Sequence, residues 1–346
     1  MVESRQPARF GRIHTPDNAW LATGPAEQIL EPELPIIDTH HHLWQRPDHR
    51  YLLHELLADL DSGHRVVATV FLQCHAMYRA SGPEEMRPVG ETEFVAGIAA
   101  MSDSGGYGPR RVAAGIVGYA DLTLGERVEA VLEAHIRAGG GRFRGVRHSG
   151  NWDADPIIGN GAPGPDVYRR ADFRAGLARL SALGLSLDAW VFFTQLGDVI
   201  DLARACPGTN IVVGHVGGVL GYGRHAGKRD EIFTSWKASV TELATCPNVT
   251  MKLGGMMMRA ALYDYGAAEQ PISSEGLAAL WRPYMETCIE LFGPTRCMFE
   301  SNFPVEKMGI GWVPLWNAFK RIAAGASADE KRALFHDTAQ RIYRLG

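Results

Sequence analysis

A regular alternation of strand-like and helix-like segments, from residue 35 onward, constrains this chain most strongly. Short apolar runs are separated by longer segments whose apolar residues recur at helical spacing. Strict alternation is typical of parallel βαβ units, and strands that are apolar throughout fit a sheet covered on both faces. Eight strands are predicted, which favours an α/β fold closed as a (β/α)8 TIM barrel. They span residues 35–41, 65–73, 112–120, 143–148, 186–191, 210–215, 248–253 and 296–303.

The remaining segments complete a single barrel domain over residues 34–346. An open doubly wound sheet is disfavoured, because no Gly-rich phosphate loop follows the first strand. Two C-terminal helices are predicted around 314–324 and 328–344. Residues 1–33 are polar, with scattered Pro and Gly, and predict an irregular arm that covers the barrel bottom, reaches a partner subunit or is partly disordered. The Gly- and Pro-rich segment 149–166 predicts a long functional loop.

Composition narrows the range of partners. The chain has 346 residues, a net charge of −4 and 46% hydrophobic residues, so nothing favours nucleic acid or an anionic membrane surface. The N-terminus lacks the apolar core of a signal peptide, and no apolar stretch approaches the roughly 20 residues of a membrane span. Five scattered cysteines without a CxxC pair indicate reduced thiols. We expect a cytoplasmic protein acting on a small molecule, and a homo-oligomer is compatible with this.

The first predicted strand ends in Asp38 and three consecutive histidines. Side chains alternate along an extended segment, so His40 and His42 point to one side and His41 to the other. Two imidazoles spaced in this way can hold one cation or one substrate oxygen. The alternative is a histidine-rich turn on the surface.

Polar side chains also stand at the ends of most other predicted strands, where the active site of such a barrel lies. A cation on a buried strand must be paired or must meet an anion. Arg147 and Lys252 therefore pair with Glu300 or Asp188, or they bind a substrate carboxylate. The strand-end candidates are Gln73, His75, Arg147, His148, Trp190, His215, Lys252, Glu300 and Asn302.

Taken together, these residues resemble the amidohydrolase superfamily, and more closely its branch of metal-dependent hydrolases and sugar-acid or dicarboxylate lactonases. The resemblance implies that His40 and His42 match the HxH pair of the first strand and that His215 matches the sixth-strand histidine. It rests on Ile37–Trp44, Phe143–His148, Ile211–Gly218, Val249–Gly255 and Cys297–Pro304, which run in family order.

The chain departs from the family pattern at two places. The eighth-strand position that usually holds an aspartate is Asn302, which cannot take up a proton. Glu300, two residues earlier on the same face, could supply the carboxylate. The modified lysine and fifth-strand histidine of binuclear members are also missing; the candidates there are Arg147 or His148, and Trp190. The resemblance therefore implies one divalent metal ion, such as Zn²⁺ held by His40, His42 and His215, or catalysis without metal.

The function expected from this resemblance is hydrolysis of a lactone or related carbonyl bond in a small carboxylate-bearing substrate. His40, His42 and His215 polarise the carbonyl, Glu300 acts as base and Asn302 orients water or substrate. The residues expected to contact substrate are Gln73, His75, Arg147, His148, Trp152 (in the 149–166 loop), Trp190 and Lys252. One alternative is a decarboxylase or hydratase acting on an aromatic or unsaturated acid. Another is a binding protein whose barrel has lost its activity.

Overall fold

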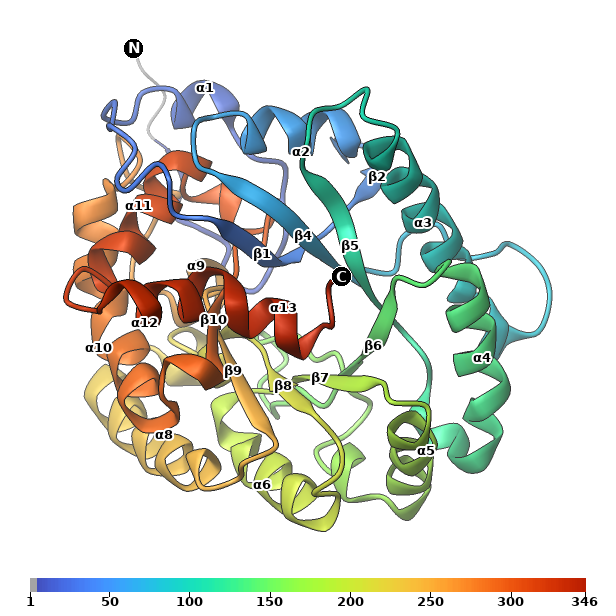
Figure 1. The fold of residues 1–346 in the computed structure, drawn as a ribbon. Helices are drawn as coiled ribbons and strands as arrows, with labels where there is room; N and C mark the ends of the chain where they lie inside the picture. Colours follow the sequence, from blue (N-terminus) through green and yellow to red (C-terminus); the bar gives the residue numbers. More distant parts are fainter. Residues whose placement is uncertain (1–4) are drawn as a thin grey trace.

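The computed structural model describes residues 5–346 and consists of one eight-stranded parallel sheet surrounded by helices (Figure 1). The strand order β1-β4-β5-β6-β7-β8-β9-β10 follows the sequence, as expected of successive right-handed βαβ units. The strands are β1 (Ile36–His41), β4 (Val66–Leu72), β5 (Arg111–Gly118), β6 (Phe143–Ser149), β7 (Ser186–Trp190), β8 (Ile211–Val213), β9 (Val249–Leu253) and β10 (Cys297–Phe299).

The barrel closes where the end of the last strand meets the first strand. The Asn302 amide donates to the His40 carbonyl at 2.8 Å, and the His42 amide donates to the Phe303 carbonyl at 2.8 Å. This seam lies beside the histidines of β1. The predicted (β/α)8 TIM barrel is therefore confirmed.

Helices fill the connections between the strands. The main ones are α2 (Leu53–Leu60), α3 (Val89–Asp103), α4 (Val128–Ala138), α5 (Ala171–Ala182), α6 (Leu196–Ala205), α8 (Arg229–Ala244), α10 (Ser274–Phe292) and α11 (Trp312–Ile322). Single turns of helix are α1 (Asn18–Leu21), α7 (His215–Gly218) and α9 (Met257–Ala260). Short 3-10 segments are Glu84–Met86, Leu122–Arg127, Val167–Arg169, Phe193–Gln195, Gly223–His225, Pro294–Arg296 and Glu306–Met308.

Two elements differ from the sequence prediction. A small antiparallel hairpin, β2 (Trp44–Arg46) with β3 (His49–Tyr51), follows β1 and was not predicted. The helix predicted over 328–344 is three pieces: α12 (Ala328–Arg332), a π-helical turn (Ala333–Asp337) and α13 (Thr338–Ile342). The segment 149–166 has no helix or strand after Ser149, as predicted.

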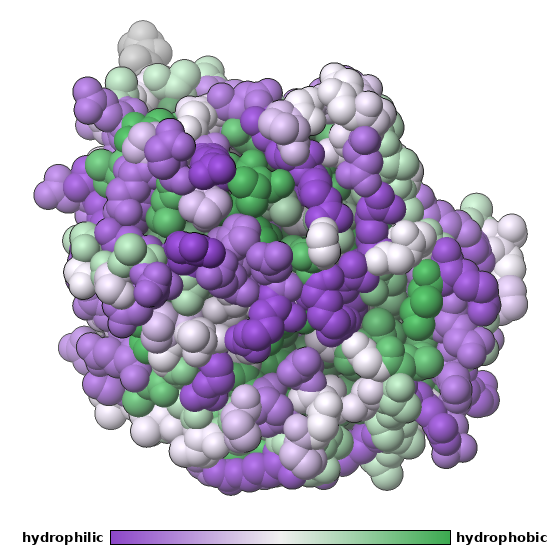
Figure 2. Space-filling model, viewed as in Figure 1, coloured by the Kyte–Doolittle hydropathy of each residue, from purple (hydrophilic) through white to green (hydrophobic). Residues whose placement is uncertain are grey.

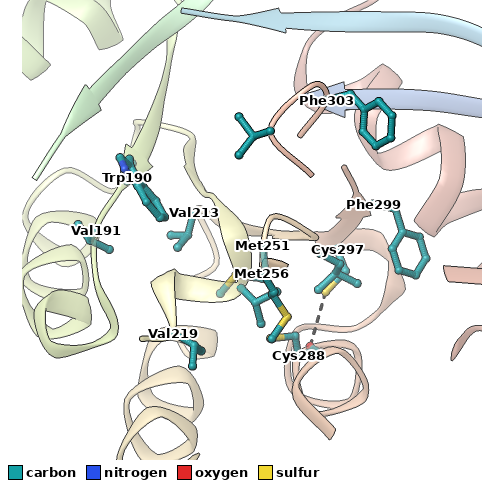
Figure 3. Close-up of a cluster of buried hydrophobic side chains, with 14 of the residues drawn as sticks. Trp190, Val191, Val213, Val219, Met251, Met256, Cys288, Cys297, Phe299 and Phe303 are labelled. Atoms are coloured by element: carbon teal, nitrogen blue, oxygen red, sulfur yellow. Dashed lines mark hydrogen bonds between the residues drawn. The ribbon is translucent and has the colours of Figure 1, made fainter. Parts of the chain in front are cut away.

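Apolar side chains on the outer face of the sheet pack against the helices. Val213 of β8, Met251 of β9 and Cys297 of β10 belong to this buried layer, and the Cys297 thiol donates to the carbonyl of Cys288 on α10 (Figure 3). Alternate strand residues, such as Val212, point into the barrel. The fold thus has an outer core between sheet and helices and an inner core inside the barrel.

The C-terminal segment fills the bottom of the barrel. In Figure 1, α13 and the chain end lie across the centre of the ring of strands. Ile342, Tyr343 and Leu345 pack against the inner residues of the strands, and the Tyr343 hydroxyl donates to Asp188 Oδ2 at 2.7 Å. This face presents mainly hydrophilic side chains, with apolar groups between them (Figure 2).

The N-terminal arm lies at the opposite end, over the carboxyl ends of the strands. The Gly11 amide donates to the Met258 carbonyl at 3.0 Å, and the His14 amide contacts Met308 Sδ at 3.2 Å. The arm was predicted to cover the barrel bottom, to reach a partner subunit or to be partly disordered. The first of these predictions is wrong for residues 5–15, because the C-terminal segment already occupies the barrel bottom. In residues 5–346, no helix has the length and apolarity needed to cross a lipid bilayer.

Candidate functional site

The histidines of β1 and the following residue occupy two different environments. His40 and His42 come together, with their Nε2 atoms 3.2 Å apart. His41 points to the other side of the strand, where its Nε2 lies 2.9 Å from the Thr69 hydroxyl in the outer core. The expected alternation, with His40 and His42 on one side of the strand and His41 on the other, is confirmed.

One carboxylate, that of Glu300, connects two of the histidine rings. Its Oε2 lies 2.7 Å from His40 Nδ1, and its Oε1 lies 2.7 Å from His215 Nδ1 and also accepts from the His215 amide at 2.9 Å. Burial raises the pKa of Glu300, but His215 and His40 outweigh this and hold it well below its usual range. For His40 the effect of burial is the opposite, because burial disfavours the charged imidazolium and so lowers the pKa. The stable arrangement is an ionised Glu300 accepting from two neutral imidazoles.

This arrangement fixes the tautomers of the three rings. His40 and His215 carry their proton on Nδ1 toward Glu300, and His42 carries it on Nδ1 toward the Leu72 carbonyl, 2.9 Å away. Each ring therefore has an unprotonated Nε2. The His40 and His42 lone pairs approach each other at 3.2 Å, which is unfavourable unless a cation or proton lies between them.

His40 and His42 are spaced so that they can share a divalent metal ion. Two imidazole nitrogens on one tetrahedral zinc ion, at about 2.0–2.1 Å each, are expected to be roughly 3.3 Å apart, close to the His40–His42 separation. Ligand atoms of His40, His215 and Glu300 also lie within 4.8 Å of one another, which allows a second ligand set. Both Glu300 oxygens already accept from imidazole Nδ1, so the donor atoms left free on these three rings are the Nε2 nitrogens.

The backbone around His215 is shaped to bring its ring onto Glu300. His215 and Val216 have φ values of 55° and 54°, a region that side chains with a Cβ seldom adopt. Two glycines after β9 make room for the pair. A Cβ on Gly255 would lie 1.7 Å from His215 Nδ1, and one on Gly254 would lie 2.2 Å from the Glu300 carbonyl oxygen. The Gly254-Gly255 pair is therefore part of the site.

Asn302 stands beside the histidines with a second carboxylate behind it. It has φ 53°, which asparagine tolerates better than most residues. Its Nδ2 lies 3.2 Å from Glu306 Oε1, and Glu306 Oε2 accepts from the Met257 amide at 2.9 Å. Burial raises the pKa of Glu306 to about 8. In this arrangement the Asn302 amide is oriented by Glu306.

A cavity of about 210 Å³ opens above the histidines. Of the predicted site residues, it is lined by Gln73, His75, Arg147, Trp190, His42, His215 and Asn302. His40 and Glu300 lie just beneath this surface, 1% and 0% exposed. The structure therefore brings nine of the predicted residues into one place.

Three residues predicted to contact substrate do not line the cavity. His148 follows Arg147 on β6, so it points to the opposite face, against Tyr119 and Phe173. Lys252 faces into the barrel but below the cavity, where it is fully buried and pairs with Asp188 Oδ2 at 3.0 Å; this is the internal pairing that the sequence left open. Trp152 packs against the outer core without lining the cavity.

The predicted role of Glu300 as the base also needs correction. A base must reach the proton it removes, whereas Glu300 is completely buried and both of its oxygens contact the histidine rings. Glu300 instead orients His40 and His215. Asn302 lines the cavity, as predicted.

The 149–166 loop reaches the site through Arg259. Asp153, which is buried, pairs with Arg224 at 2.8 Å and His225 at 3.0 Å and so fastens the loop to the segment after β8. The carbonyl of Ile158 then accepts from Arg259 Nη1 at 2.7 Å. The loop is therefore a support for a cavity-lining arginine.

Several cavity residues were not predicted from the sequence. Trp44 was inside a motif that carried the family resemblance, but only its neighbours were singled out. Arg46 lies on the unpredicted hairpin and Arg259 on the single turn α9, and neither position has a recognisable sequence signal. The residues that were missed are Ile13, Trp44, Arg46, Cys74, Ser149, Gly255, Arg259 and Val305; Met258, one of three consecutive methionines for which either a pocket or a core position was considered, also lines the cavity.

Comparisons with known proteins find relatives along most of this chain. The chain is 32% identical over 339 residues to an uncharacterized protein, y4mH, of Sinorhizobium fredii, which covers 90% of this chain and 99% of that protein. It is 31% identical over 242 residues to the L-fucono-1,5-lactonase of Burkholderia multivorans, which covers 68% of this chain and 72% of the lactonase.

A solved structure is similar along nearly its whole length. The crystal structure of an amidohydrolase from Burkholderia multivorans with bound zinc has a TM-score of 0.68 and 26% identity, covering 90% of this chain and 99% of that one. The model of the amidohydrolase family matches residues 37–345, from the second residue of β1 to the penultimate residue of the chain. This chain therefore belongs to the amidohydrolase family of enzymes.

Proposed function

We propose that this enzyme is a lactonase that hydrolyses the cyclic ester of a small acid-bearing substrate. The observation that carries the proposal is the set of three unprotonated Nε2 atoms, from His40, His42 and His215, at the base of a cationic cavity. Relatives named lactonases, from Burkholderia multivorans and, for an L-rhamnono-gamma-lactonase, from Scheffersomyces stipitis, support the same reaction class.

The three histidines form the reacting end of the cavity. A divalent metal such as Zn²⁺, when bound there, supplies polarisation of the lactone carbonyl and acidification of a water molecule. Glu300 and the Leu72 carbonyl fix the ring orientations, so that the three nitrogens need no rearrangement when substrate arrives.

Two further residues handle water and the transferred proton. Asn302 holds water or substrate by hydrogen bonding from the side of the cavity. His75 lines the cavity outside the histidine triad, and burial together with the charges of Arg147 and Arg46 lowers its pKa, so it is neutral near pH 7. A neutral imidazole in this position can accept the proton of the attacking water and return it to the alkoxide that leaves when the ring opens.

The acid group of the substrate binds Arg147. This guanidinium lies at the cavity. It makes no ion pair with any described carboxylate, and its one hydrogen bond is a long contact of 3.5 Å to the Gln73 carbonyl. Burial lowers its pKa without removing its charge. A planar carboxylate is the natural partner for such a group.

The test combines metal analysis with a panel of lactones. We expect the purified protein to contain about one equivalent of divalent metal and to hydrolyse acid-bearing lactones. His42→Ala should lower kcat/KM by at least about 100-fold, since it removes one of the three imidazoles, whereas His54→Ala, on the exposed face of α2, should leave it unchanged. Full activity in His42→Ala, or release of CO2 from an acid substrate without lactone hydrolysis, would refute the proposal.

A further inference from the structure

We propose that Glu91, on α3, is a positioning residue for this reaction, because its carboxylate holds the backbone on both sides of His75. The inference rests on the proposed function, in which His75 carries a proton from the attacking water to the departing alkoxide. Glu91 is completely buried and does not line the cavity, so it acts on His75 and not on the substrate.

One oxygen of this carboxylate bridges two backbone amides. Glu91 Oε1 accepts from the Cys74 amide at 2.9 Å and from the Ala76 amide at 2.8 Å. These amides belong to the residues immediately before and after His75. Glu91 Oε2 is also buried and has no hydrogen-bond partner among residues 5–346. The hydrogen bonds of this side chain are therefore directed at the backbone that carries His75.

The backbone of His75 needs such support. Its φ is 62°, in the left-handed region that residues with a Cβ seldom adopt. A conformation of this kind persists where the surrounding structure holds it. His75 is exposed at the rim of the cavity, so packing in the core does not keep its ring in place. The two hydrogen bonds to Glu91 fix the backbone on each side instead.

The start of α3 also fixes the residues that follow His75. Gly90 packs directly against them, because a Cβ there would lie 2.6 Å from the Met77 carbonyl oxygen and 2.7 Å from the Arg79 amide nitrogen. Met77 has a φ of 53° and is a second left-handed residue in the same segment. Gly90 and Glu91 therefore form one anchor, which holds residues 74–79 against α3.

Tyr78, in the anchored segment, contacts the His75 ring. Its hydroxyl lies 3.2 Å from His75 Nδ1, and burial raises the pKa of Tyr78, so the hydroxyl stays neutral. A His75 ring that donates from Nδ1 to this hydroxyl has an unprotonated Nε2. In the proposed reaction the water oxygen bonds to the lactone carbonyl carbon as its proton moves to Nε2. The same proton then passes to the ring oxygen as the bond between that oxygen and the carbonyl carbon breaks.

The length of the Glu91 side chain matters more for this role than its charge. Burial raises the pKa of Glu91 to about 7, although the Cys74 and Ala76 amides oppose this. A proton bound by the carboxyl group can occupy Oε2, which has no partner, so Oε1 accepts from both amides in either charge state. Positioning therefore depends on an oxygen at this distance from the helix.

Two substitutions separate length from charge. Glu91→Asp keeps the carboxylate but is one methylene shorter, whereas Glu91→Gln keeps the length and the accepting oxygen but loses the charge. Rates are measured with 5-oxotetrahydrofuran-2-carboxylate, a lactone with one carboxylate, and with the other acid-bearing lactones of the panel. Glu91→Asp should lower kcat by about 10- to 100-fold, up to the loss expected when a catalytic group is misplaced by about 1 Å. KM should change by less than about 2-fold. Glu91→Gln should keep kcat at least about 5-fold above that of Glu91→Asp.

The same substitution in a His75→Ala background tests whether the effect passes through His75. There Glu91→Asp should lower kcat by less than about 2-fold, because the group that Glu91 positions is absent. The matched control is Glu93→Asp, which should behave as wild type, since Glu93 pairs with Arg79 of the same segment at the surface. An undiminished kcat in Glu91→Asp, an equal loss in Glu91→Gln, or a loss that persists in the His75→Ala background would overturn the inference.

NMR of protein labelled with ¹⁵N-histidine provides a measurement that needs no activity. The His75 ring signals are assigned by their loss in His75→Ala. They should show the Nδ1–H tautomer in wild type and Glu91→Gln, and a mixture of tautomers in Glu91→Asp. If no lactone is hydrolysed but the tautomer changes in this way, the positioning role stands and the lactonase falls. If lactones are hydrolysed and Glu91→Asp changes neither kcat nor the tautomer, the lactonase stands and the positioning role falls.

Discussion

At the scale of single residues, the carboxylate of Glu300 controls two of the three histidine rings. An amide in its place can accept a hydrogen bond on only one side, so either His40 or His215 must turn or change tautomer. We therefore expect Glu300→Gln to weaken divalent metal binding by about 10- to 100-fold. Zinc competition against a chromogenic chelator measures this directly. Glu286→Gln on α10 is the control, and equal zinc affinity in both variants would contradict the prediction.

Glu306 predicts a pH dependence of stability. Its pKa is about 8 in the folded protein and 4.5 as an ordinary glutamate, so the folded chain keeps a proton that the unfolded chain has released. The free energy of unfolding therefore falls as pH rises from about 4.5 to 8, by up to about 1.4 kcal/mol per pH unit from this group. Glu306→Gln cannot titrate and should lack this slope.

Urea unfolding of wild type and Glu306→Gln at pH 5, 6.5 and 8 tests this dependence. The wild type should lose stability relative to the variant across the series. Glu290→Gln, on the exposed side of α10, is the control and should follow the wild type. Parallel curves for wild type and Glu306→Gln would show that Glu306 is ionised throughout.

The sequence was informative about residues whose chemistry is unusual for their position. Polar side chains recur at the ends of several apolar strands, so His40, His42, His215 and Asn302 could be predicted to gather at one end of the barrel. His41 and His148 carry the same signal but face the other side of their strands. Arg46 and Arg259 lie in polar segments, where an arginine needs no explanation. Glu300 was recognised as a site residue but given the wrong role. Its two oxygens accept hydrogen bonds from His215 and His40, which lie 85 and 260 positions earlier in the chain, and local sequence does not reveal these contacts.

At the scale of elements, periodicity located the strands but not the exact points where they end. The eighth strand was predicted over 296–303, whereas β10 stops at Phe299 and the chain turns to place Asn302 at φ 53°. The β2–β3 hairpin was missed because each of its strands has three residues, too few for a recognisable pattern. Both errors fall at the carboxyl ends of strands, where function shapes the backbone more than packing does.

The N-terminal arm predicts an effect on catalysis. Ile13 lines the cavity, and the Gly11 amide holds the segment next to Arg259 through Met258. Deletion of residues 1–15 should therefore open the site to water and lower kcat/KM by about 10-fold, mainly through KM. Arg9→Ala, an exposed position in the arm, should behave as wild type. An unchanged KM in the deletion variant would assign the arm a role outside catalysis.

At the scale of the whole molecule, the C-terminal segment closes the end of the barrel away from the site. The Tyr343 hydroxyl donates to Asp188, which in turn pairs with Lys252. Tyr343→Phe leaves a buried charged group with one donor fewer, so we expect it to lower the free energy of unfolding by about 1.5–3 kcal/mol. Denaturant unfolding measures this. Metal content should not change, and Tyr107→Phe, whose hydroxyl makes no hydrogen bond in the described chain, is the control.

The overall architecture was predictable because each strand and helix carries its own periodic signal, and eight repeats of that signal outweigh an error in any one. The closures at the two ends of the barrel were not predictable. Residues 5–15 and 338–346 are placed by contacts with strands and loops more than 100 residues away, such as Gly11 with Met258 and Tyr343 with Asp188. Local sequence patterns contain no information about such contacts.

The seam where β10 meets β1 has a consequence for protein synthesis. His40 and His42 are among the first barrel residues to leave the ribosome, but their partners Glu300, Asn302 and Phe303 are translated about 260 residues later. Until then the first strand has an unpaired edge and two imidazoles without the carboxylate that orients them. The growing polypeptide therefore cannot acquire its active site gradually. Any truncated product that stops before residue 300 lacks it entirely.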